Sequence, residues 1–131
     1  MDDATILCVD DEPNQLVLRK LMLEKAGYRV LTAESPMQAL EIFGSHPVDL
    51  VIVDYYMPGM TGLALASNLL QQRKIPVMVL SAYPELPGES IGLANIWVSK
   101  GTPPEELLTK LADLLSGSKS AADLQIDKLP N

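Results

Sequence analysis

The chain has 131 residues, of which 47% are hydrophobic, with a formal net charge of −7 and one cysteine. This length and apolar content indicate one folded domain with a single core and exclude an intrinsically disordered chain. The negative charge argues against binding to nucleic acid or to a membrane surface, and no apolar run is long enough to span a bilayer.

The cysteine and the start of the chain indicate a cellular compartment. Cys8 lies inside an apolar run and cannot form an internal disulfide, so we expect a buried core thiol. The acidic start Met1-Asp2-Asp3 is not that of a signal peptide. Both features predict a cytoplasmic protein.

Five short apolar runs bounded by turn residues predict strands. Runs that are apolar at nearly every position are typical of strands buried on both faces, as in a parallel sheet. The predicted strands cover residues 5–9, 28–32, 48–53, 75–80 and 95–99.

The segments between these runs predict helices. Ser35 and Gln38 form a capping box for the second helix, and Gly117 is expected to end the last one. Prolines and glycines in residues 83–92 allow only a short or irregular helix there. The regular helices are expected at residues 13–26, 36–44, 62–72 and 103–117, the first burying Leu16, Leu18, Leu21 and Met22.

Strand and helix therefore alternate five times. With short connections, this order predicts an α/β fold of the flavodoxin-like, doubly wound (βα)5 type, a five-stranded parallel sheet with helices on both faces. We expect one domain over residues 1–117 and a polar C-terminal tail or linker over residues 118–131.

Polar residues follow four of the predicted strands. Because carboxyl ends of parallel strands share one edge of the sheet, we expect these side chains to converge. Carboxylates in close proximity repel one another unless a cation lies among them, and an oxygen cluster suits Mg²⁺. The residues are Asp10 and Asp11 after the first strand, Asp54 after the third, Ser81 after the fourth and Lys100 after the fifth.

Such a site is suited to a phosphoryl group. Asp54 can act as a nucleophile and form an acyl phosphate. Lys100 and the metal would neutralise charge on the transferring oxygens, and the Ser81 hydroxyl would donate to one of them.

These residues resemble a known family, the receiver domains of two-component response regulators. The resemblance covers about residues 4–116 and combines an acidic pair after the first strand with the segment DYYMPGMTG from Asp54 to Gly62, Ser81 and Lys100. It implies a phosphorylation switch in which Asp54 accepts phosphate from the phosphohistidine of a sensor histidine kinase. It implies no turnover of external substrates, and it leaves room for an output domain or a downstream protein partner.

The resemblance also implies individual roles. Asp11, Asp54 and the backbone carbonyl of Tyr56 would bind Mg²⁺ directly, and Asp10 would act partly through water. Ser81 and Lys100 would hold the phosphoryl group. Trp97, three residues before the lysine, would change rotamer together with Ser81.

The chain departs from the family pattern at three places. Lys100-Gly101 replaces the usual Lys-Pro, which leaves the isomer of this peptide open. The fourth helix is rich in breakers. Tyr56 and Tyr83 are bulky residues two positions beyond Asp54 and Ser81, and they predict slow autodephosphorylation.

Two alternatives belong to other classes. A phosphohydrolase of the haloacid-dehalogenase type would carry its nucleophile after the first strand in a D-x-D pattern, whereas this strand is followed by Asp10-Asp11-Glu12. An adaptor that is never phosphorylated would not need the complete set of acids, serine and lysine.

Overall fold

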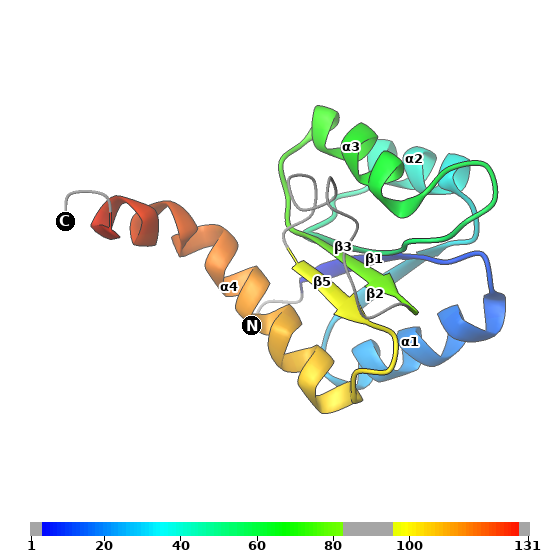
Figure 1. Cartoon of the computed structure of the whole chain (residues 1–131), viewed down its shortest axis with the longest axis horizontal. Coiled ribbons are helices and arrows are strands. Elements are labelled where there is room, and N and C mark those ends of the chain that lie inside the picture. Colours follow the sequence, from blue (N-terminus) through cyan, green and yellow to red (C-terminus); the bar gives the residue numbers. More distant parts are fainter. Residues whose placement is uncertain (1–3, 83–95, 129–131) are drawn as a thin grey trace.

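A computed structural model describes residues 4–82 and 96–128, with side chains described as far as residue 117. Its centre is a parallel sheet with the strand order β2-β1-β3-β4-β5, which confirms the flavodoxin-like prediction (Figure 1). β1 has the expected bounds, and the bounds of the other strands differ from those expected by at most two residues. The strands are β1 (Thr5–Val9), β2 (Arg29–Ala33), β3 (Leu50–Asp54), β4 (Val77–Ser81) and β5 (Ile96–Ser99).

Helices cover both faces of the sheet, as expected (Figure 1). α2 (Pro36–Ser45) and α3 (Gly62–Gln72) lie on one face, and α1 (Pro13–Lys25) and α4 (Pro104–Lys128) lie on the other. The irregular helix expected within residues 83–92 lies outside the described residues. None of the described helices has the length and apolar character needed to cross a membrane.

Alternation along the strands divides the core into two layers. Leu7, Val9, Val51 and Val53 pack toward α2 and α3. The intervening residues Ile6, Cys8, Leu50 and Ile52 pack toward α1 and α4. Both faces are buried because both are covered by helices, which is why these strands are apolar throughout. Burial raises the pKa of the Cys8 thiol to about 12, and the thiol is unpaired, as predicted.

Side-chain caps set the starts of α2 and α3. Ser35 Oγ accepts a hydrogen bond from the backbone N–H of Gln38 at 3.1 Å, which confirms the predicted cap. The reciprocal bond of Gln38 comes from the N–H of Glu34, one residue earlier than a standard capping box. Thr61 Oγ1 caps α3 in the same way, accepting from the N–H of Ala64 at 3.1 Å.

The predicted buried face of α1 is partly wrong. The helix buries Leu16, Arg19 and Leu23, whereas Leu18 and Leu21 are exposed. Leu16 and Leu23 are about two helical turns apart, so they share a face that also includes Arg19. The apolar residues at 18 and 21 misled the prediction because α1 carries apolar side chains on more than one side.

The predicted end of α4 at Gly117 is also wrong. The helix continues to Lys128, and its C-terminal part projects away from the sheet (Figure 1). A glycine inside a helix costs only about 1 kcal/mol relative to alanine, and no proline follows until Pro130. The glycine therefore does not stop the helix.

Candidate functional site

Two acids meet where β1 and β3 end. The strands are paired in register up to Val9 and Val53, so Asp10 and Asp54 follow at the same edge. Both continue the row of residues that faces α1 and α4. Asp10 is completely buried and Asp54 is 5% exposed. The sequence prediction that these strand ends converge is confirmed for this pair.

Asp11 completes a cluster of three carboxylates. Asp10, Asp11 and Asp54 each offer an oxygen, and these atoms lie within 4.8 Å of one another. Asp11 is exposed, so the cluster opens to solvent on its side. Three anionic oxygens at this spacing form a donor set that suits a hard divalent cation such as Mg²⁺. The residues present therefore fit the metal that the sequence predicted.

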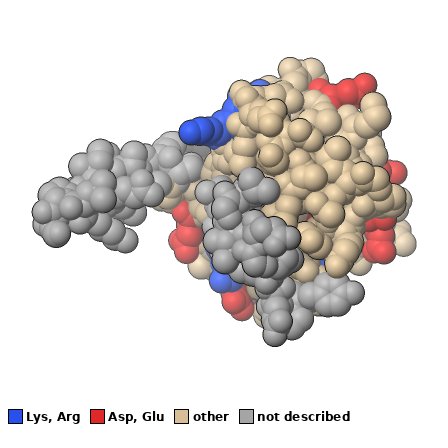
Figure 2. Space-filling view, turned by 45° about the horizontal axis from the view of Figure 1, so that its top comes forward, with Lys and Arg blue, Asp and Glu red and all other residues tan. Residues whose placement is uncertain are grey.

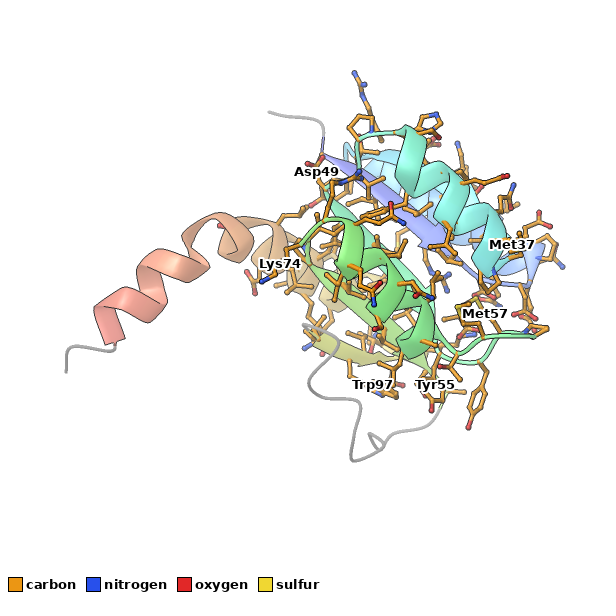
Figure 3. The ribbon with its side chains drawn as sticks, turned by 90° about the horizontal axis from the view of Figure 1, so that it is seen from above. Met37, Asp49, Tyr55, Met57, Lys74 and Trp97 are labelled. Carbon is orange, nitrogen blue, oxygen red and sulfur yellow. The ribbon has the colours of Figure 1, made fainter. Side chains whose placement is uncertain are left out.

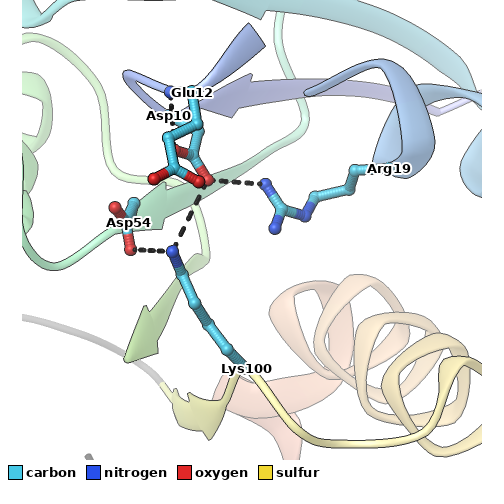
Figure 4. A network of polar contacts seen from close by, with 5 residues as sticks. All are labelled: Asp10, Glu12, Arg19, Asp54 and Lys100. Atoms are coloured by element: carbon cyan, nitrogen blue, oxygen red, sulfur yellow. Dashed lines mark hydrogen bonds and ion pairs between the residues drawn. The ribbon is translucent and has the colours of Figure 1, made fainter. Parts of the chain in front are cut away.

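Lys100 reaches the cluster from the loop after β5. Its Nζ lies 2.9 Å from Asp54 Oδ1 and 3.8 Å from Asp10 Oδ2 (Figure 4). The side chain is 28% exposed, whereas both acids are nearly or wholly buried. Lys100 thus neutralises part of the cluster, and its ammonium group borders the predicted nucleophile.

A second cation, Arg19 of α1, was missed by the sequence analysis. Its Nη1 lies 3.3 Å from Asp10 Oδ2, and the pair is buried (Figure 4). Asp10 Oδ1 accepts a hydrogen bond from the N–H of Glu12 at 3.0 Å. The available signal was the position of Arg19, which shares the helix face of Leu16 and Leu23 and therefore points toward the sheet.

The pKa of Asp54 is raised above its ordinary value. Burial is the largest cause, because it disfavours the charged carboxylate. The hydrogen bond from Lys100 lowers the pKa, and the negative charges of Asp10 and Asp11 raise it further. The site therefore favours an additional cation beside Asp54 when this carboxylate is ionised.

The loop after Asp54 is shaped by two glycines. Gly59 follows Pro58 and has φ +87°, a combination typical of a type II turn. Gly62 opens α3, and its N–H donates to the carbonyl of Tyr55 at 2.7 Å. A Cβ at Gly62 would overlap the backbone carbonyl of Asp54. The Gly62 position thus allows α3 to start directly against the strand end that carries Asp54.

Ser81 is buried at the end of β4, at the same edge of the sheet as Asp54. Its carbonyl accepts from the N–H of Lys100 at 2.8 Å, so these two residues are neighbours. The N–H of Gly101 donates to Ser99 Oγ at 3.1 Å. No peptide bond within the described ranges is cis, so the Lys100-Gly101 bond is trans. The roles predicted for the Ser81 hydroxyl and for the Tyr56 carbonyl stay predictions.

Three aromatic side chains, those of Tyr55, Tyr56 and Trp97, form a cluster next to the site on the α3 side of the sheet. The rings of Tyr55 and Trp97 lie 5.2 Å apart between centroids, side by side in Figure 3. Tyr55 also meets Tyr56 edge-on at 4.7 Å, and Tyr56 is 57% exposed. Within the part of the chain that the structure describes, the buried indole Nε1 of Trp97 has no hydrogen-bond partner. The predicted rotamer change of Trp97 stays a prediction.

Comparison with known proteins agrees with this geometry. The family model for the response regulator receiver domain matches residues 6–112. The chain is 38% identical over 110 residues to the response regulator GtcR of Aneurinibacillus migulanus, which covers 82% of this chain and 46% of that protein. It is 34% identical over 121 residues to the phosphate regulon transcriptional regulatory protein PhoB of Pseudomonas aeruginosa, covering 88% of this chain and 53% of that protein.

One similar solved structure is a response regulator with a bound metal. The response regulator TrrA of Thermotoga maritima, in complex with Mg²⁺ and BeF, has a TM-score of 0.79 and 38% sequence identity, covering 85% of this chain and 98% of that one. The first curated relatives are longer, and this chain spans about half of their length. The family model covers most of the chain, and the strand order and the cluster of Asp10, Asp11 and Asp54 agree with it. The chain therefore belongs to the response regulator receiver domain family of two-component systems.

Proposed function

We propose that this receiver domain accepts a phosphoryl group on Asp54 in a Mg²⁺-dependent reaction and changes conformation in response. The observation that carries the proposal is the cluster of Asp10, Asp11 and Asp54, with Lys100 Nζ 2.9 Å from the Asp54 carboxylate. The complex of the Thermotoga maritima relative with Mg²⁺ and BeF supports the same assignment.

In this proposal Asp11, Asp54 and the Tyr56 carbonyl would hold Mg²⁺ directly, and Asp10 would act partly through water. When bound, the metal supplies positive charge that stabilises the oxygens of the phosphoryl group. The fit rests on the three carboxylate oxygens within 4.8 Å of one another.

The chain's own residues perform the transfer. An Asp54 oxygen attacks phosphorus as the bond to the donor breaks, and the donor nitrogen or oxygen leaves with the bonding electrons. Lys100 is close enough to Asp54 to neutralise a phosphoryl oxygen on the new acyl phosphate. Ser81 would donate its hydroxyl hydrogen to another. Because Ser81 and Trp97 lie on adjacent strands, we propose that Trp97 repacks against Tyr55 when Ser81 moves.

Labelling with acetyl phosphate tests the assignment. The intact mass of the wild-type chain is expected to increase by one phosphoryl group in the presence of Mg²⁺ and to stay unchanged with EDTA, because the crowded carboxylates repel an anionic donor without the metal. A chain that acquires no phosphoryl group under either condition would be the adaptor that is never phosphorylated.

Tyr56 is expected to slow the loss of the phosphoryl group. Its exposed side chain lies two residues beyond Asp54, held edge-on against Tyr55, where it would restrict the path of an attacking water. Replacing Tyr56 by Asn should therefore shorten the half-life of the labelled protein several-fold, measured by intact mass after removal of the donor. Tyr56→Phe keeps the bulk and should preserve the wild-type half-life. Tyr83, the other bulky position, lies outside the described residues.

We propose that the domain is a phosphoacceptor and not a turnover enzyme. Its family favours this role over the haloacid-dehalogenase alternative. Steady release of phosphate from a small phosphoester, catalytic in protein, would contradict it.

The partners follow from the role. We propose that a sensor histidine kinase donates the phosphate in the cytoplasm. Residues 118–131 either link the domain over 1–117 to an output domain or form a tail on a domain that signals to a separate protein target. The greater length of the curated relatives and the extension of α4 beyond Gly117 support a linker. We propose that this domain does not itself bind nucleic acid, and its formal net charge of −7 supports this. On the face shown in Figure 2, the Lys and Arg side chains of described residues form no continuous patch.

A further inference from the structure

Arg19 lies on the buried face of α1, among residues that belong to the core. It lies on the helix face of Leu16 and Leu23 and is only 9% exposed. An arginine is rarely buried to this degree unless a partner compensates its charge. The partner is Asp10, whose Oδ2 lies 3.3 Å from Arg19 Nη1.

Arg19 and Lys100 approach the same oxygen from different elements. Lys100 Nζ lies 3.8 Å from Asp10 Oδ2, so this atom faces one cation from α1 and another from the loop after β5 (Figure 4). The three carboxylates of the cluster are thus opposed by two cations of the chain itself. Lys100 is partly exposed and reaches toward Asp54, whereas Arg19 is buried and contacts Asp10.

Burial makes the charge of Arg19 effective at the metal position. Interactions between buried charges are screened by salt much less than those at the surface. A cation paired with Asp10 makes the electrostatic potential of the whole cluster less negative. It also occupies Asp10 Oδ2, an oxygen that would otherwise be available to the metal or to its bound water. Both effects oppose the binding of a dication.

We propose that Arg19 is a resident counter-ion that positions Asp10 and weakens the affinity of the acidic cluster for Mg²⁺. This inference rests on the proposed function, because it assumes that Mg²⁺ binds at Asp10, Asp11 and Asp54. Arg19 acts through Asp10 and is a positioning residue. Arg19 stabilises the three carboxylates while the metal is absent. Mg²⁺ therefore gains less from binding, because Arg19 already compensates part of their negative charge.

Replacing Arg19 by Met tests the proposal, since methionine keeps an unbranched side chain and removes the charge. The dissociation constant of Mg²⁺, measured by calorimetry and by the fluorescence of the single Trp97, is expected to fall by roughly tenfold, or about 1.4 kcal/mol. The melting temperature without Mg²⁺ should also fall, because Asp10 loses its buried partner, and saturating Mg²⁺ should recover part of this loss. Neither readout depends on phosphorylation.

Lys20→Met is the matched control. Lys20 belongs to the same helix and carries the same charge, but it is exposed and pairs with Glu24. The control should keep the wild-type dissociation constant, which separates a local effect from a change in net charge. Arg19→Gln serves as a second variant that retains a donor for Asp10, and it should also bind Mg²⁺ more tightly.

The outcomes are distinguishable. Tighter binding by Arg19→Met or, if this variant does not fold, by Arg19→Gln supports the inference. Unchanged or weaker binding in a folded variant, judged by circular dichroism, overturns it while leaving the proposed function intact. If the wild type itself binds no Mg²⁺, or if Asp11→Asn binds it equally well, the proposed function fails and the inference fails with it.

Discussion

Replacing Asp54 by Asn is expected to reduce phosphoryl labelling to background and to raise the melting temperature in Mg²⁺-free buffer at neutral pH. Labelling is lost because an amide is not a nucleophile toward phosphorus. Stability rises because the Asp54 carboxylate is destabilised by burial and by repulsion from Asp10 and Asp11. The raised pKa of Asp54 indicates that this destabilisation exceeds the stabilisation from Lys100. Intact mass and thermal unfolding measure the two effects.

The stability gain should depend on pH in a defined direction. The pKa of Asp54 is raised in the folded protein above its ordinary value of 3.8. Protonated Asp54 therefore contributes stability that is fully present below pH 3.8 and is lost as the pH rises through the folded-state pKa. The wild type and Asp54→Asn should differ least in acid and most near neutrality. A difference that grows toward low pH would contradict the raised pKa.

Asp49→Asn is the control for both measurements. Asp49 precedes β3 at the opposite edge of the sheet, and its Oδ2 accepts a hydrogen bond from the N–H of Thr5 at 2.7 Å. This variant should still be labelled in the presence of Mg²⁺. If Asp54→Asn were labelled as fully as the wild type, another residue would be the phosphoacceptor.

Replacing Gly62 by Ala is expected to destabilise the fold and to slow labelling. The added Cβ would overlap the carbonyl oxygen of Asp54 and lie 3.0 Å from its carbonyl carbon and 3.1 Å from the Cα of Tyr55. These are backbone atoms, so α3 or the end of β3 must shift. Such overpacking typically costs about 1–3 kcal/mol. Chemical unfolding measures the free energy, and the rate of labelling by acetyl phosphate reports the displacement of Asp54.

Gly44→Ala is the matched control for this effect. Gly44 lies in α2, and the nearest atom to an added Cβ is Gln72 Oε1 at 3.8 Å, an ordinary contact. Alanine is favoured over glycine in a helix by about 0.5–1 kcal/mol, so this variant should be as stable as the wild type or more so. Equal effects of the two substitutions would show that the close approach at Gly62 is not responsible.

The sequence alone predicted most of the fold and most of the site. The fully apolar runs around Cys8 and Ile52 indicated strands buried on both faces, and the alternation of strands and helices indicated a parallel sheet covered by helices on both faces. The chain length favoured the flavodoxin-like strand order. The acids at 10, 11 and 54 and the lysine at 100 were identified because polar residues at the ends of such strands must meet at one edge. These inferences succeeded because they depend on local pattern and on the geometry of parallel sheets.

The errors arose where a residue's neighbours decide its role. Leu18 and Leu21 were assigned to the core, but the face of α1 that contacts the sheet is set by docking against β1 and β2, not by the number of leucines. Gly117 was assigned as a helix end, although a lone glycine is a weak signal when the residues after it still favour a helix.

The sequence by itself determined the succession of strands and helices along the chain and the set of acids and lysine at the strand ends, because side-chain period and turn chemistry are properties of the chain alone. Only the tertiary structure decided which cation meets which acid. Arg19 reaches Asp10 because α1 packs across the sheet at an orientation that buries its guanidinium, and Gly62 meets Asp54 because α3 starts against the end of β3. Contacts of this kind depend on the relative placement of whole elements, which comes from the packing of the complete core.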